Sequence, residues 1–198
     1  MSYLTDPDEF FAQRADDPDW LLPVLLVFSA GFLPAIGSWY AIQQIFSGGG
    51  VGIIVAVFGS AGALVGVFLL WIVGAAVFHG VSAVFDGEGS FWRTLWLSGW
   101  GYVPSVIAGG ATMVALLLAA STLPPATTGQ EFVQVNMQLQ THQYVQWASY
   151  FGLVMSVWQG VIWAFAVRHA RGLELREGAI AVAPFVLANL GLTLRGLL

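Results

Sequence analysis

Long uncharged, apolar runs separated by short polar segments dominate the chain. Residues 20–85 contain no Asp, Glu, Lys or Arg. Because a helix needs about 20 apolar residues to cross a bilayer, this stretch predicts two membrane spans. The consecutive glycines at 48–50 mark the break between them, since glycine is least costly in a turn. We predict spans at 20–46 and 51–77, with residues 78–85 continuing the second helix to the membrane interface.

Three further apolar runs follow, which brings the expected number of spans to five. The turn at 86–90 ends in Ser90, a residue suited to cap the next helix, and Pro104 predicts a kink within that helix. Residues 124–146 form a polar loop rich in Gln and Thr, and the pattern there does not distinguish strand from helix. The remaining spans are predicted at 94–123, 147–167 and 178–197, the last of which barely reaches the length of a bilayer.

The first 19 residues are acidic and polar, and three of them carry the signature of a helix start. Asp6 is a good N-cap, Pro7 suits the first helical position, and Glu9 stands three residues after the cap, as a capping box requires. We therefore expect a short amphipathic helix on the membrane surface. Phe10 and Phe11 are expected to enter the headgroup layer beside the first span.

The pattern defines the fold class and the domain division. We predict an all-α, polytopic membrane protein with a bundle of five transmembrane helices and a short N-terminal amphipathic surface helix. The chain divides into a cytoplasmic lead-in at 1–19 and a membrane domain at 20–198.

Composition agrees with a lipid environment and excludes several classes of function. Apolar residues make up 58% of the chain and charged residues 9%, whereas a soluble domain carries roughly a quarter charged residues. The chain has no Cys, which excludes disulfides, thiolate nucleophiles and Cys-ligated metals. Its net charge is −5 and all six basic residues are Arg, without a polybasic patch, so nucleic acid is not an expected partner.

The distribution of Arg predicts the orientation in the membrane, because basic residues near a span resist translocation. With five spans and the N-terminus inside, five of the six Arg residues lie on the cytoplasmic side and only Arg195 lies outside. We therefore predict a multi-pass protein of the cell membrane with its C-terminus outside. The five inner residues are Arg14, Arg93, Arg168, Arg171 and Arg176.

Small residues recur every fourth position along the fourth span, and a similar pattern occurs in the second. Small side chains allow helix backbones to approach closely in lipid. Such a stripe indicates either packing between spans of one chain, which we favour, or an oligomer interface. The residues are Ala148, Gly152, Ser156, Gly160 and Ala164 in the fourth span, with Gly62 and Gly66 in the second.

Aromatic and polar residues around the predicted kink are a second point of interest. A helix that bends after Trp100, Gly101 and Tyr102, at Pro104, can line a groove. Gln159 near the middle of the fourth span needs a hydrogen-bond partner on another helix, and Asn189 is a possible one. Apart from Arg195 near the end of the last span, no predicted span contains an acidic or basic residue, and none holds one at a depth where it could relay protons or bind a transported ion.

No motif of a catalytic or metal site is present. The sequence contains no P-loop, GxSxG or HExxH pattern, and its His and acidic residues lack metal-ligand spacing. We expect no catalytic residue, no cofactor and no metal, and therefore a protein that is not an enzyme.

Three segments resemble the Yip1-domain family. They are the opening Asp6-Pro7-Asp8-Glu9-Phe10-Phe11, the turn from Phe85 to Phe91, and Gly101-Tyr102-Val103-Pro104. The resemblance implies five spans with a cytosolic N-terminus. Eukaryotic members carry an Asp-Leu-Tyr-Gly-Pro motif and are associated with Rab-type GTPases. That motif is missing here, which weighs against GTPase binding, and the chain is similar to the prokaryotic branch.

Two functions are consistent with these observations. The first is a non-enzymatic scaffold, partner-binding protein or complex subunit, whose partners are the lipid bilayer and other membrane proteins or a second copy of the chain. The alternative is a small permease or transporter accessory for a neutral solute, with the bent third span and Gln159 lining its path.

Overall fold

The computed structural model describes residue 3, residues 6–46 and residues 50–197, and most of these residues lie in helices. Within those ranges the only β-type contact is an isolated bridge between Phe46 and Ala126. The predicted all-α class is confirmed. The helices are α1 (Pro7–Ala12), α2 (Leu21–Ile45), α3 (Gly50–Ser82), α4 (Phe91–Gly99), α5 (Val103–Ala120), α6 (Gly129–Gln140), α7 (Gln143–Arg171) and α8 (Leu175–Leu197), with 3₁₀ turns η1 (Ala83–Phe85) and η2 (Trp100–Tyr102).

Five segments of the described chain are long and apolar enough to cross a membrane, which confirms the predicted five-helix bundle. The second segment reaches Phe85, as its uncharged sequence predicts. Of the predicted glycine break at 48–50, Gly48 and Gly49 lie outside the described residues. Helix α3 begins at Gly50. The segments are Leu21–Ile45, Gly52–Phe85, Phe91–Ala120, Gln143–Arg171 and Leu175–Arg195.

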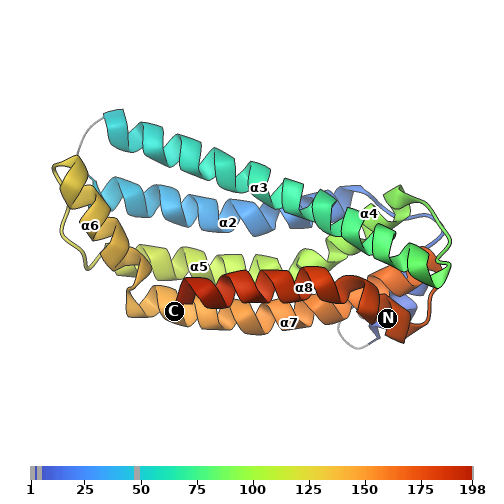
Figure 1. The fold of residues 1–198 in the computed structure, drawn as a ribbon. Coiled ribbons are helices and arrows are strands. Elements are labelled where there is room, and N and C mark those ends of the chain that lie inside the picture. Colours follow the sequence, from blue (N-terminus) through green and yellow to red (C-terminus); the bar gives the residue numbers. More distant parts are fainter. Residues whose placement is uncertain (1–2, 4–5, 47–49, 198) are drawn as a thin grey trace.

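The spans are not equally covered by one another. Helices α2, α5 and α7 form the centre of the bundle, and α8 packs along α7. Helix α3 lies at the edge and runs at an angle to the other spans (Figure 1). Only 6% of its most apolar window is buried within the protein, against 39% for α7. Most of α3 therefore faces the surrounding medium.

The N-terminal helix forms as predicted but packs differently. The Asp6 carboxylate accepts a hydrogen bond from the backbone N–H of Glu9 at 3.1 Å, and Pro7 occupies the first turn. Phe10 and Phe11, however, are buried against α4 and α7. The expectation that these rings enter the headgroup layer is therefore wrong, because the end of the bundle covers them.

The third span is broken, as Pro104 predicts. The 3₁₀ turn η2 separates α4 from α5, and Pro104 lies in the first turn of α5, where its missing N–H is not needed. The predicted cap is also present, since the Ser90 hydroxyl accepts a hydrogen bond from the Arg93 N–H at 3.2 Å. Neighbouring helices approach each other closely at the break. A Cβ on Gly99 would stand 2.6 Å from the Cβ of Pro23 in α2.

The segment between the third and fourth spans, which the sequence pattern left unassigned, contains helix α6. It begins with a capping box, in which Thr128 and Glu131 each accept a hydrogen bond from the backbone of the other. Val135 and Leu139 are buried against the ends of α2 and α5. Helix α6 therefore covers the end of the bundle opposite α1 (Figure 1).

Candidate functional site

A cavity of about 200 Å³ lies in the bundle beside the break in the third span. Four polar side chains line it: Tyr102 in η2, Ser105 in α5, Gln159 in α7 and Asn189 in α8. Gln159 is near the middle of α7, so the cavity is at mid-depth. The rest of the wall is apolar and consists of Ala30, Val67, Leu70, Trp163 and Phe185.

Gln159 and Tyr102 are the most deeply buried polar groups of this cavity, each only 5% exposed. The Ser105 hydroxyl donates a hydrogen bond to Oε1 of Gln159 at 2.9 Å. Asn189, which the sequence suggested as the partner of Gln159, lines the same cavity, but the hydrogen bond comes from Ser105. Sequence spacing gave no signal for this pairing, because the two residues lie on helices separated by α6.

The residues of the predicted groove divide between the cavity and the protein interior. Tyr102 and Gln159 line the cavity, whereas Pro104 is buried in the bundle. Gly101 lies against the Trp163 indole, so closely that a Cβ would collide with it. Trp100 faces α1 instead, where its ring lies 4.9 Å from that of Phe10. The sequence did not indicate Trp163 as part of this site.

Two tryptophans from neighbouring helices bind the polar groups at the end of α4. The Trp163 indole N–H donates to the Ser98 carbonyl at 2.8 Å. The Trp71 indole N–H lies 3.1 Å from both the Leu95 carbonyl and the Ser98 hydroxyl. These bonds satisfy polar groups where the third span leaves regular α-helical geometry.

A buried arginine organises the end of the bundle that carries α1. Arg171 is 4% exposed, and its guanidinium donates to the Ser82 hydroxyl at 2.8 Å and to the carbonyls of Gly87 and Gly89. Its own carbonyl accepts the N–H of Glu88 at 2.8 Å. Arg171 therefore fixes the turn between the second and third spans, a role the sequence did not indicate because its partners are more than 80 residues away.

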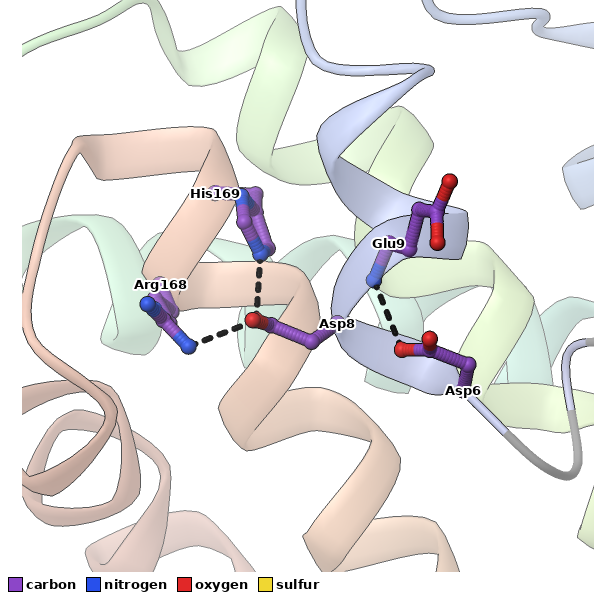
Figure 2. Close-up of polar contacts among 5 residues, drawn as sticks. All are labelled: Asp6, Asp8, Glu9, Arg168 and His169. Carbon is purple, nitrogen blue, oxygen red and sulfur yellow. Dashed lines mark hydrogen bonds and ion pairs between the residues drawn. The ribbon is translucent and has the colours of Figure 1, made fainter.

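The N-terminal helix is attached to α7 by an acidic residue, as Figure 2 shows. Asp8 lies 2.6 Å from the Arg168 guanidinium and 2.7 Å from Nε2 of His169. The hydrogen bond from His169, with the charge of Arg168 added, lowers the pKa of the Asp8 carboxyl below its usual value. Asp6 and Glu9 point away from this contact and form the cap of α1.

The stripe of small residues in α7 lies near helix α5 at one end and near helix α8 at the other. At one end Ala148 lines a shallow apolar groove with residues of α5. At the other end a Cβ on Gly160 would lie 3.2 Å from the Val186 side chain of α8, and Ala164 is buried nearby. Between them Ser156 donates to the Gly152 carbonyl at 2.9 Å, and a Cβ on Gly152 would meet nothing within 4 Å.

Three glycines in the middle of α3 face outward, whereas Gly52 and Gly74 pack against other residues. A Cβ added at Gly59, Gly62 or Gly66 would meet no other atom within 4 Å. Large side chains around them, such as Phe58 and Val65, are more than half exposed. Nothing in the described chain therefore packs on this face, which we call the α3 glycine face and define by Gly59, Gly62 and Gly66.

These features define an α-helical, multi-pass membrane protein. In the part of the chain that the structure describes, no three His, Asp or Glu side chains are grouped as metal ligands. The family model of the Yip1 domain matches residues 1–195. The chain therefore belongs to the Yip1-domain family, as its turn and its Gly-Tyr-Val-Pro segment indicated.

An archaeal protein is similar to this chain over most of its own length. It is the uncharacterized protein MJ0794 of Methanocaldococcus jannaschii, 28% identical over 148 residues, which cover 69% of this chain and 94% of the relative. No solved structure matches the chain.

Replacing Arg171 by Gln is expected to loosen the turn at 86–90. The loss of the guanidinium removes the donors to the Ser82 hydroxyl and to the Gly87 and Gly89 carbonyls, which costs about 1–3 kcal/mol. Hydrogen exchange of the 86–90 amides should speed up and the melting temperature in detergent should fall. Arg176→Gln, at an exposed position, is the control and should change stability by less than about 0.5 kcal/mol. Equal effects of the two substitutions would refute the role of Arg171.

Asp8→Asn is expected to release α1 from α7 at neutral pH. A lowered carboxylate pKa stabilises the folded state above the unfolded value of about 4, and this contribution is lost as pH falls through the lowered value. A nitroxide on Ala12→Cys should therefore show a mobile fraction roughly two- to five-fold larger in Asp8→Asn, as for a surface ion pair. With Asp8 unchanged, the label should show this increase only in acid. Glu9→Gln is the control, and equal mobility in both variants at pH 7 would contradict the assignment.

Proposed function

We propose that this Yip1-family protein is a non-enzymatic membrane scaffold or complex subunit that binds a transmembrane helix of another membrane protein, or of a second copy, on the α3 glycine face. The observation that carries the proposal is the open space at Gly59, Gly62 and Gly66. The proposal requires no catalytic residue, cofactor or metal.

Glycine on a lipid-facing helix has a cost without a benefit unless another helix packs there. Each glycine within a helix costs roughly 1 kcal/mol relative to alanine, and lipid tails contact leucine as favourably as any apolar residue. A second helix gains from glycine, because the two backbones can approach closely. The sparse burial of α3, at 6% of its most apolar window, leaves this face available.

The orientation follows from the arginines at the end of the bundle that holds α1. We infer that this end is cytoplasmic, because Arg14, Arg93, Arg168 and Arg171 gather around α1, the 86–90 turn and the end of α7. The opposite end, covered by α6, then lies outside the cell membrane. This arrangement leaves the acidic N-terminal segment exposed to cytosolic partners.

The alternative function is a permease or transporter accessory for a neutral solute. The mid-depth cavity with its polar lining favours it. Its volume of about 200 Å³ corresponds to only about seven water molecules at roughly 30 Å³ each. A cavity of this size suits a bound molecule better than a continuous path, so we prefer the scaffold.

Cysteine cross-linking tests the scaffold, because the chain contains no Cys of its own. Gly62→Cys, coupled to a photoreactive maleimide and irradiated in native membranes, should give a covalent adduct of defined larger mass, because the photolabel needs no thiol on the partner helix. Leu187→Cys, on a lipid-facing position of α8 that is 67% exposed, is the matched control and should give none. Gly62→Leu and Gly66→Leu should abolish the adduct of Gly59→Cys without changing the melting temperature, since both sites are open. Absence of an adduct, or equal adducts at both helices, would contradict the proposal.

The same background tests the orientation. Gln130→Cys, in α6, should react with a membrane-impermeant maleimide on intact cells. Glu174→Cys, in the connection between α7 and α8, should react only after the membrane is permeabilised. The reverse labelling would show that the α1 end faces outward.

A further inference from the structure

The polar atoms that line the mid-depth cavity are not all paired within the protein. Ser105 occupies Oε1 of Gln159, but within the described chain neither the amide nitrogen of Gln159 nor the Tyr102 hydroxyl has a hydrogen-bond partner. Both side chains are 95% buried. In the described chain, every side-chain nitrogen or oxygen that has no accessible surface has a hydrogen-bond partner. The Gln159 amide nitrogen and the Tyr102 hydroxyl have no partner, so both must have accessible surface, and we take that surface to face the cavity that both residues line.

Unpaired donors at this depth point to a bound acceptor. Leaving a polar group without a partner in an apolar environment costs about 1–3 kcal/mol. The side chain of Asn189, half-buried in α8, is also directed to this cavity and has no partner in the described residues. Three hydrogen-bonding groups from three elements therefore surround one space.

The wall of the cavity defines what the acceptor is attached to. Every lining residue is uncharged, so a charged molecule would lose its hydration without compensation. The Trp163 ring centroid lies 5.8 Å from that of Tyr102 and 5.6 Å from that of Phe185. These aromatic side chains form one side of the cavity and suit a flat ring.

The cavity also has a route to the lipid. Leu70 of α3 lines the cavity and is 54% exposed on the outside of the bundle. The cavity is not fully enclosed, and Leu70 brings its wall next to the outer surface of α3, which is where a ligand from the membrane would enter and leave an apolar tail.

We infer that this cavity binds the head group of a quinone-type molecule, which is a neutral, membrane-dissolved ring that carries carbonyl oxygens. The Tyr102 hydroxyl and the Gln159 amide donate to its carbonyls, and the ring packs against Trp163 and Phe185. The apolar tail leaves past Leu70. This binding site is independent of the α3 glycine face and does not require the proposed scaffold.

Photolabelling of the purified protein in lipid nanodiscs tests the site. The probe is an azido-benzoquinone with a ten-carbon tail. Its labelling should saturate, should map by mass spectrometry to residues that line the cavity, and should be displaced by decylbenzoquinone. Decylbenzene, with the same ring size and tail but no carbonyl, should displace it at least about ten-fold less well, since it accepts no hydrogen bond.

Two substitutions assign the donors. Tyr102→Phe keeps the ring and removes the hydroxyl, and Gln159→Leu removes the amide at similar volume. Each should weaken the affinity about five-fold, the equivalent of one hydrogen bond. Ser156→Ala is the matched control, because Ser156 lies one turn from Gln159 on α7 and bonds only the Gly152 carbonyl. The affinity of Ser156→Ala for the azido-benzoquinone probe should equal that of the unsubstituted protein.

Each other outcome overturns the inference. Labelling that does not saturate would show only that the probe partitions into lipid. Equal displacement by decylbenzene would show the same, and in both cases the cavity would be taken to hold water instead of a quinone. Labels outside the lining residues, or unchanged affinity in Tyr102→Phe, would exclude this site. If Gln159→Leu does not assemble, Tyr102→Phe and the two competitors still decide the question.

Discussion

The structure of the bundle depends on how the polar backbone groups at the break in its third span find hydrogen-bond partners without water. Lipid offers no hydrogen-bond partner, so a helix can interrupt its ladder within a membrane only where neighbouring side chains replace the missing bonds. At this break the Trp163 and Trp71 indoles donate hydrogen bonds to the Ser98 and Leu95 carbonyls of α4. Glycine at 101 allows the Trp163 indole to approach that closely.

Other features of the bundle follow from this contact. The break turns Tyr102 and Ser105 toward α7 and α8, so that polar groups of the third span meet Gln159 across the cavity. Trp163 contributes both to the contact and to the wall of the cavity. At the end of the bundle that carries α1, Arg171 has a comparable role, because it supplies donors to carbonyls in the 86–90 turn. In both places a long polar side chain from α7 replaces water.

Local signals in the sequence predicted local structure well. Uncharged runs predicted the five spans, and short-range capping patterns predicted the starts of α1 and α4 at Asp6 and Ser90. Helix α6 has the same kind of signal in Thr128 and Glu131, but its weak apolar pattern left the segment unassigned. The interruption of the helix near Pro104 was also predictable, because proline restricts the backbone directly.

Contacts between distant segments were not predictable from one sequence. The burial of Phe11, the pairing of Ser105 with Gln159 and the role of Arg171 depend on which helix faces which. Hydropathy is nearly uniform around a helix in lipid, so it does not specify that face. For the same reason the spacing of small residues predicts close helix packing at both Gly152 and Gly160. In the described chain, of these two, only Gly160 lies against a neighbouring helix.

The thermal stability of Gly101→Ala, compared with Gly110→Ala in the same span, tests most directly whether the Trp163 contact holds the bundle together. At position 101 the added methyl group displaces the indole, whereas at 110 the nearest atom is 4.0 Å away. The account predicts that Gly101→Ala lowers the melting temperature in detergent by roughly 4–8 °C, while Gly110→Ala leaves it unchanged or slightly raised. Equal melting temperatures for the two variants would contradict it.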